Sequence, residues 1–185
     1  MNLIVFPLKH ENPFPVKVTC GTPVRIDDNS MILCSGIGSP GVSNLGKTLF
    51  DYPEIESVFE FGSAASVKGG VAGEIYECTT FLGLDGKIVG NSGRVTKLPI
   101  AAVTGDDNLY LGEKFSWAEN LEMPLIYTME TLRFRNIAIE FCKHFASIRL
   151  VTDDGTGNIR EQVAKHINLS KQKIRKLFVT LKTVD

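Results

Sequence analysis

The sequence predicts a single α/β domain with three layers (α/β/α), in which helices cover both faces of a mixed, mostly parallel central sheet. Short apolar runs alternate with helical patterns, and no internal repeat or low-complexity segment interrupts them. A chain of 185 residues is long enough to bury one substantial core. We therefore expect one domain over residues 1–185, with ligands bound where loops leave the carboxyl ends of the strands.

Each element is predicted from its hydrophobic pattern and from the turn residues that flank it. The expected strands are residues 3–6, 30–34, 57–61, 74–81, 98–103 and 147–151. The expected helices are residues 41–50, about 125–145, 158–167 and 170–181. Residues 83–122 are richer in Gly, Asn and Asp, which indicates a surface excursion or a lid over a site.

Charge and membrane signals exclude several classes of partner. The formal net charge is −1, so no broad positive field exists to attract a nucleic acid. The basic residues between positions 171 and 182 are better explained as a solvated helix face. The apolar start ends at Pro7 and no run approaches the roughly 20 apolar residues of a membrane span. We expect a protein that binds neither nucleic acid nor membrane.

The cysteines indicate the compartment. The four cysteines, Cys20, Cys34, Cys78 and Cys142, are far apart, and three of them lie in apolar runs. This usage is typical of reduced, packed thiols and argues against a disulfide framework or a zinc site. We therefore expect a cytoplasmic protein without a bound metal.

Residues 41–48 (GVSNLGKT) match the phosphate-binding pattern G-x-x-x-x-G-K-[ST]. Such a loop needs a strand that runs directly into its first glycine, but here six residues follow the strand that ends at Cys34. Val42, Leu45 and Leu49 have helical spacing, which places Gly-Lys-Thr inside a helix, where it cannot wrap a phosphate. Because residues 148–153 could serve as the acidic strand of such a site, a magnesium-dependent P-loop nucleotide hydrolase remains an alternative.

Four other short motifs occur in a fixed order along the chain. They are GIG at 36–38, EFGSAA at 60–65, YTMET at 127–131 and IRLVTDD at 148–154. Each has an ordinary explanation: a strand-to-helix turn, tight packing, a helix start that favours an acid, and a turn. Together they place small residues and carboxylates at the carboxyl ends of strands, as a site for a flat base and its sugar requires.

This series resembles the purine nucleoside and uridine phosphorylase superfamily. It is most similar to the hydrolytic branch, the methylthioadenosine/S-adenosylhomocysteine nucleosidases. The family motifs G-I-G, G-x-T-x-L, N-T-G-S-A-G, V-D-M-E-A and V-R-x-x-S-D correspond here to GIG, GKTL, EFGSAA, YTMET and IRLVTD. The resemblance spans about residues 30–165 and implies that the P-loop pattern is a chance reading of the family's first helix.

The resemblance implies a role for each matched residue. Asp153 would protonate the purine nitrogen N7, with Thr152 helping to fix the base, while Glu130 would bind the ribose hydroxyls and Met129 would pack against the sugar. The further substrate-binding residues implied are Gly36 and Gly38 in the turn, Ser63, Ala64 and Ala65 along the base pocket, and Phe115 and Tyr110 as stacking candidates.

The nucleophile distinguishes a hydrolase from a phosphorylase. Hexameric phosphorylases carry a phosphate-binding arginine two residues before the Gly-Ser motif, where this chain has Glu60. A carboxylate repels phosphate, so water is the favoured nucleophile. By resemblance, Glu11 and Arg149 would orient that water, with His10 as a substitute for Glu11.

The resemblance therefore implies hydrolysis of a purine nucleoside modified at the 5′ position, of the methylthioadenosine, S-adenosylhomocysteine or futalosine type. It implies a homodimer, with no metal or organic cofactor. The alternatives are a phosphate-dependent phosphorylase and a catalytically silent nucleoside-binding protein of the same fold.

Overall fold

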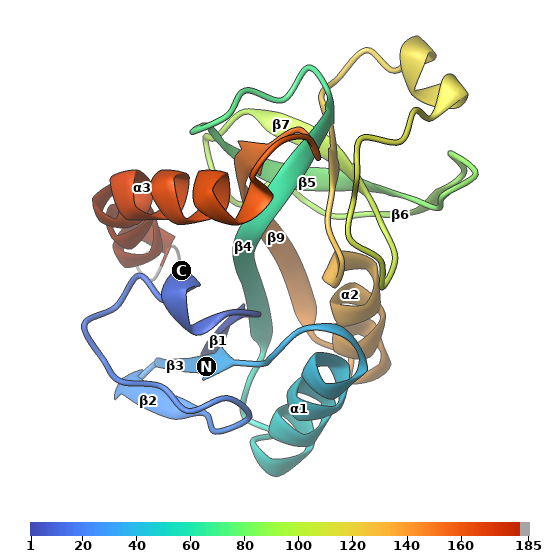
Figure 1. Ribbon diagram of the computed structural model, residues 1–185. Helices are drawn as coiled ribbons and strands as arrows, with labels where there is room; N and C mark the ends of the chain where they lie inside the picture. The colour runs from blue at the N-terminus through green and yellow to red at the C-terminus, as the bar shows by residue number, and fades with distance from the viewer. Residues whose placement is uncertain (182–185) are drawn as a thin grey trace.

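The computed structural model describes residues 1–181, and a mixed sheet lies at its centre (Figure 1). Its strands are β1 (Asn2–Phe6), β2 (Val24–Asp27), β3 (Ser30–Cys34), β4 (Ser57–Lys68), β5 (Ile75–Leu82), β6 (Ile88–Asn91), β7 (Ile100–Thr104), β8 (Leu125–Tyr127) and β9 (His144–Asp153). The helices are α1 (Gly38–Asp51), α2 (Thr131–Glu140) and α3 (Ile159–Leu181), with short 3₁₀ helices η1 (Lys9–Glu11) and η2 (Ser116–Asn120).

The strand order explains how the sheet curves. The order is β2-β3-β1-β4-β8-β7-β5-β6, and β9 pairs with both β4 and β5. Strands β4, β8, β7, β5 and β9 therefore form a closed ring, and β1 to β3 extend from it as an open sheet. Within the described residues, five of the nine strand pairings are parallel. The mixed, mostly parallel sheet is confirmed.

Two helical layers cover opposite faces of the open sheet, as Figure 1 shows. Alternate side chains of a strand point to opposite faces, and β1 follows this rule. Ile4 and Phe6 pack in the same cluster as Ile174 and Phe178 of α3. The opposite cluster contains Leu3 and Val5 of β1, Leu45 and Leu49 of α1, and Phe134 and Ala138 of α2. The three-layer α/β/α architecture is confirmed.

The P-loop interpretation is wrong. Gly46, Lys47 and Thr48 lie inside α1, and the Thr48 hydroxyl donates a hydrogen bond of 2.8 Å to the Asn44 carbonyl, one turn earlier. The turn before the helix is instead built by Gly36 (φ +85°) and Gly38 (φ +62°), a backbone conformation that glycine adopts readily. A helical Gly-Lys-Thr cannot form a phosphate cradle.

The structure also corrects several expected boundaries. The helix expected over residues 125–145 is three elements: β8, then α2, then the start of β9. A short apolar run cannot be assigned to strand or helix by periodicity alone, and residues 125–127 pair with β4 and β7. The helices expected over 158–167 and 170–181 are one continuous helix, because no Gly or Pro separates them. The short strands β2 and β6 were not expected.

The exposed side chains of α3 agree with the solvated face that the sequence predicts. Lys171, Lys173, Arg175 and Lys176 are exposed, while Ile174 and Phe178 are buried against the sheet. Lys182, which belongs to the same basic segment, lies outside the described residues. No helix between residues 1 and 181 combines the length and the apolar character needed to cross a membrane.

Candidate active site

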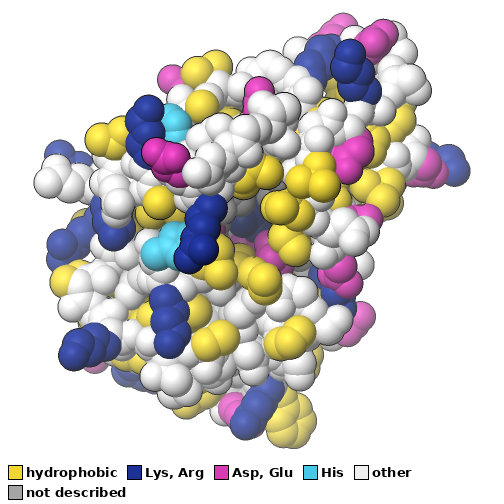
Figure 2. Space-filling model, viewed as in Figure 1, with side chains coloured by type: hydrophobic (Ala, Val, Ile, Leu, Met, Phe, Trp, Pro, Cys, Tyr) yellow, Lys and Arg dark blue, Asp and Glu magenta, His cyan; other side chains and the backbone are white. Residues whose placement is uncertain are grey.

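A pocket of about 660 Å³ opens where β4 and β9 end. Figure 2 shows a hollow on this face, with hydrophobic side chains around it and acidic ones inside. Segments far apart in the sequence form its walls: η1, β4, the start of α2, the end of β9 and the first turns of α3. The expected site residues that line it are Glu11, Ser63, Ala64, Ala65, Tyr110, Met129, Glu130, Arg149, Thr152 and Asp153.

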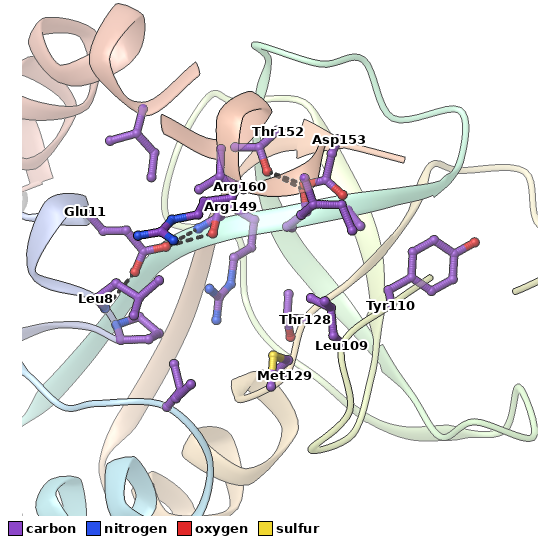
Figure 3. Close-up of a pocket in the computed structure, with 18 of the residues that line it drawn as sticks. Leu8, Glu11, Leu109, Tyr110, Thr128, Met129, Arg149, Thr152, Asp153 and Arg160 are labelled. Atoms are coloured by element: carbon purple, nitrogen blue, oxygen red, sulfur yellow. Dashed lines mark hydrogen bonds between the residues drawn. The ribbon is translucent and has the colours of Figure 1, made fainter. Parts of the chain in front are cut away.

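Glu11 is held in the pocket by three hydrogen bonds. It is only 2% exposed, and its Oε1 accepts from both the backbone N–H and the hydroxyl of Ser63, each at 2.8 Å. Its Oε2 accepts from the Leu8 N–H at 2.9 Å. Burial raises the pKa of Glu11, while the hydrogen bonds from Ser63 and the charge of Arg149 act in the opposite direction. The carboxylate is thus fixed in one orientation beside the middle of β4 (Figure 3).

Arg149 is completely buried, and its charge is compensated by Glu60. Its Nη2 binds the Glu60 carboxylate and donates to the Thr131 hydroxyl at 2.5 Å. Burial alone lowers the pKa of Arg149, but the charges of Glu60 and Glu130 raise it above its usual value. Its Nη1 is buried without a partner among the described residues, although Arg149 lines the pocket. This nitrogen can donate to a ligand or to water.

The glycine of the GS motif allows the arginine to approach the strand. A Cβ added at Gly62 would lie 2.3 Å from Arg149 Nη1 and 3.4 Å from Glu11 Oε1. Any side chain here would collide with the guanidinium. Gly62 therefore brings the free Nη1 of Arg149 and the carboxylate of Glu11 to the same point of β4.

Glu130 lies directly before α2 and is 6% exposed. Burial raises its pKa to about 7, because the opposing effect of Arg149 is smaller, and the nearby carboxylates of Glu60 and Glu11 raise it further. Its side chain makes no capping hydrogen bond to the helix. The carboxyl group is therefore available to a ligand and changes charge near neutral pH.

Asp153 is the last residue of β9 and is 6% exposed. Its Oδ2 accepts from the Thr152 hydroxyl at 2.7 Å, and its Oδ1 accepts from the Gly155 N–H at 3.0 Å. These two contacts fix the carboxyl group at the side of the pocket opposite Glu11, as Figure 3 shows. Within residues 1–181, no three His, Cys, Asp or Glu side chains converge in a way that could hold a metal ion.

Three expected binding residues lie outside the pocket lining. The ring of Phe115 stacks on Tyr110 and Tyr127, with centroids 6.4 Å from each, so it supports the aromatic wall from behind. The turn glycines Gly36 and Gly38 flank Ile37, whose side chain is the part of the turn that reaches the pocket. Tyr110 and Tyr127, 5.1 Å apart and stacked, form the aromatic wall itself.

Sequence reasoning missed the wall that α3 supplies. Ile159, Val163 and Ile167 line the pocket at intervals of four residues, which is the pattern of a helix face packed on a core. Tyr127 was missed because the segment was expected to be helical. For Arg160, an exposed side chain that reaches into the pocket in Figure 3, the sequence carried no signal.

No protein-family model matches the chain, and no curated protein matches it. Solved structures do match it along its whole length. A 5′-methylthioadenosine/S-adenosylhomocysteine nucleosidase from S. pneumoniae, solved with a transition-state inhibitor, is 15% identical, with a TM-score of 0.74 and 100% of each chain covered.

Two further matches have the same TM-score of 0.74. A Helicobacter pylori nucleosidase mutant with 5′-methylthioadenosine in its active site is 12% identical, with 97% of this chain and 98% of that chain covered. A putative nucleosidase from Borrelia burgdorferi B31, bound to adenine, is 14% identical, with 98% of both chains covered. The fold that the sequence motifs predicted is therefore confirmed: this chain has the nucleoside phosphorylase-like fold of the methylthioadenosine/S-adenosylhomocysteine nucleosidases.

Proposed function

We propose that this protein hydrolyses the N-glycosidic bond of a purine nucleoside modified at its 5′ position. One observation carries the proposal: Glu11, Glu130 and Asp153 come from three different elements into one pocket, and the buried Arg149 lies among them. Cleavage of this bond places positive charge on the ribose and negative charge on the departing base. Separated carboxyl groups can neutralise both, one as an acid and the others as anions.

The two ends of the pocket suit the two parts of the nucleoside. Asp153, next to Thr152, would give a proton to N7 of the base, whose flat ring would lie against the small side chains of Ala64 and Ala65. Glu130 would accept hydrogen bonds from the ribose hydroxyls, with Met129 against the sugar. When ionised, Glu130 would also stabilise the oxocarbenium-like ribose electrostatically.

Water is the nucleophile that this arrangement favours. Glu11 Oε1 and the unpartnered Nη1 of Arg149 meet at Gly62, where they could hold a water molecule between a proton acceptor and a donor. The sequence argument that Glu60 faces and repels phosphate needs a correction, because Glu60 does not line the pocket. It acts through Arg149 instead: a guanidinium already paired with a buried carboxylate is a poor site for phosphate.

The 5′ side of the substrate would meet apolar side chains. Leu8, Ile37 and Val163 supply apolar side chains to the pocket lining. A methylthio group or a longer thioether fits such a lining, and so does the 5′ substituent of futalosine. Two of the nucleosidases described above were solved with methylthioadenosine or a transition-state inhibitor, and the third with adenine, which supports a nucleoside of this class.

The test is release of free base, measured by chromatography. Purified protein is incubated with methylthioadenosine, S-adenosylhomocysteine, adenosine, inosine and futalosine, each with and without phosphate. We expect base release from a 5′-modified substrate at the same rate in both conditions. Release only with phosphate would establish a phosphorylase, and binding without release would establish a silent nucleoside-binding protein.

We further propose that the protein acts as a single-domain cytoplasmic homodimer without a cofactor. Light scattering coupled to size-exclusion chromatography tests the dimer, and a monomeric mass at micromolar concentration would contradict it. Full activity after extensive treatment with a chelator tests the absence of a metal requirement.

A further inference from the structure

A second hollow, of about 580 Å³, lies at the opposite end of the same strands. The first residues of β1, β4 and β9 (Asn2, Ser57 and His144) contribute to it, together with residues 91–95 and one side of α2. Figure 1 shows β4 and β9 running side by side between the two ends. We call this site the basic hollow. None of the sequence motifs points to it.

The charged side chains of the basic hollow all have one sign. Arg94, Arg135 and Lys143 line it, and no Asp or Glu does. Two of the carboxylates next to lining residues in the sequence pair elsewhere: Glu56 faces the amino terminus of Met1 at 3.7 Å, and Glu60 pairs with Arg149. In a chain whose formal net charge is −1, this is a local concentration of cationic groups in a cavity. A concave surface of one charge sign attracts a ligand of the opposite sign.

Arg135 is held in place without an anionic partner. Its guanidinium lies over the ring of Phe81, with Cζ 5.0 Å from the ring centroid. It also lies against the backbone of β6, because a Cβ added at Gly90 would be 2.0 Å from Arg135 Nη2. In residues 1–181, no carboxylate forms an ion pair with it. The planar donor is therefore positioned before any ligand arrives.

The wall formed by residues 91–96 is fixed from below by Glu77. This completely buried carboxylate accepts from the backbone N–H groups of Val95 at 2.5 Å and of Thr96 at 2.9 Å, and from the Thr96 hydroxyl at 2.5 Å. The Ser92 hydroxyl adds a hydrogen bond to the Cys78 carbonyl at 3.2 Å. A wall anchored in this way needs little ordering when a ligand binds, which favours affinity.

The floor of the basic hollow is apolar. Phe145 lines it and is half-buried, with the buried Val58 beside it on the same face of the sheet, and Ile139, which is 48% exposed, lies at its edge. An apolar floor adds no binding free energy for an inorganic ion, but it stabilises a ligand that carries a flat ring or another apolar group.

We propose that the basic hollow binds a small organic anion, in which a phosphate or carboxylate group contacts Arg135 and an apolar or aromatic body rests on Phe145, whose ring lies next to that of Phe81. The cavity volume suits a ligand up to about the size of a mononucleotide. The site does not depend on the proposed nucleosidase activity, because it shares no lining residue with the candidate active site.

Isothermal titration calorimetry with phenyl phosphate, benzoate and inorganic phosphate tests the proposal. We expect saturable binding of phenyl phosphate or benzoate, and the tighter of the two identifies the anionic group. Arg135→Gln should weaken binding at least about tenfold, because it removes a charge-assisted hydrogen bond. Lys87→Gln is the matched control: it removes an exposed charge that pairs with Asp85 outside the hollow, and it should leave affinity unchanged.

Two further variants keep the test decisive. Lys143→Gln removes a second charge from the hollow, away from the Phe81 contact, and should also weaken binding if Arg135→Gln proves unstable. Glu130→Gln should not affect binding, since Glu130 belongs to the other pocket. The proposal fails if neither organic anion binds, if Arg135→Gln and Lys143→Gln bind like the wild type, or if Glu130→Gln abolishes binding. Equal affinity for inorganic phosphate would contradict the contribution of the apolar floor.

Discussion

The two hollows at opposite ends of β4 and β9 differ in charge, although the same elements build them. At the carboxyl ends, these strands supply Ser63, Arg149 and Asp153 to a pocket with three buried carboxylates. At the amino ends they supply Phe59 and His144 to a hollow with no carboxylate in its lining. Helix α2 also contributes to both sites: Glu130, directly before its first turn, lines the candidate active site, and Arg135 lines the basic hollow.

The two sites also differ in how their charged groups are buried and hydrogen-bonded. The carboxylates lie in the interior, and hydrogen bonds from Ser63, Thr152 and backbone N–H groups give Glu11 and Asp153 one defined orientation each. Such order suits chemistry, which needs groups positioned before the reaction. The cations of the basic hollow are closer to the surface: Arg135 lies over the ring of Phe81, while Arg94 and Lys143 donate to backbone carbonyls. This arrangement suits reversible binding of an anion.

Asp153→Asn should have the largest effect, and it should affect the candidate active site without affecting the basic hollow. The variant keeps the shape of the side chain but cannot supply the proton, so base release should fall by about 10²–10⁴-fold. Nucleoside affinity should change only a few-fold, and phenyl phosphate binding in the basic hollow should not change. Base release and calorimetry on the same preparation measure all three.

The neighbouring Asp154 provides the control for that variant. Asp154 is exposed and its carboxylate caps its own turn through Thr156, so Asp154→Asn should keep nearly full turnover. Unchanged base release in Asp153→Asn would remove Asp153 from the mechanism, and an equal loss in Asp154→Asn would point to the turn instead of the acid.

Glu60→Gln should have the next largest effect, this time on stability. It leaves the buried guanidinium of Arg149 without its counter-charge, and breaking a buried pair in this way costs about 3–5 kcal/mol. For a chain of this size, the melting temperature should fall by about 6–20 °C, measured by differential scanning calorimetry.

A double variant distinguishes an uncompensated charge from a general packing defect. Combining Glu60→Gln with Arg149→Met removes both charges and should recover most of the lost stability. Glu56→Gln, at the exposed start of the same strand, should stay within about 0.5 kcal/mol of the wild type. If the double variant is less stable than Glu60→Gln alone, the pairing is not the source of the loss.

The sequence predicted the acidic end of this comparison better than the basic end. The ME motif directly precedes α2 and the TD motif ends β9, whereas the GS motif lies within β4. Because β4 and β9 are parallel, Ala65, just after the GS motif, pairs with Asp153 of the TD motif. Their side chains therefore had to meet. The pairing of Glu60 with Arg149 could not be predicted from the sequence, since 89 residues separate the two and no motif links them.

The parts that could not be predicted depend on tertiary packing. Ile159 and Val163 follow a pattern that is the same whether a helix face covers a core or lines a pocket. Residues 125–127 form a strand because they pair with β4 on one side and with β7 on the other. This tertiary pairing overrides the helical pattern of the sequence. The basic hollow combines residues from positions 2 to 146, and only the folded sheet edge brings them together.

Glu130→Gln should have the smallest of the three effects, and one that depends on pH. The pKa of Glu130 is raised from 4.5 to about 7 in the folded protein, mainly by burial. Between these values the folded state holds a proton that the unfolded state has lost, so the free energy of unfolding falls as the pH rises. The loss amounts to about 3 kcal/mol by pH 8.

Glutamine does not titrate, so the free energy of unfolding, measured with denaturant between pH 5 and 8, should decline less steeply for Glu130→Gln than for the wild type. Lys143→Gln, a change at the basic end, should follow the wild-type decline. Parallel curves for wild type and Glu130→Gln would mean that Glu130 titrates normally and is already ionised at neutral pH.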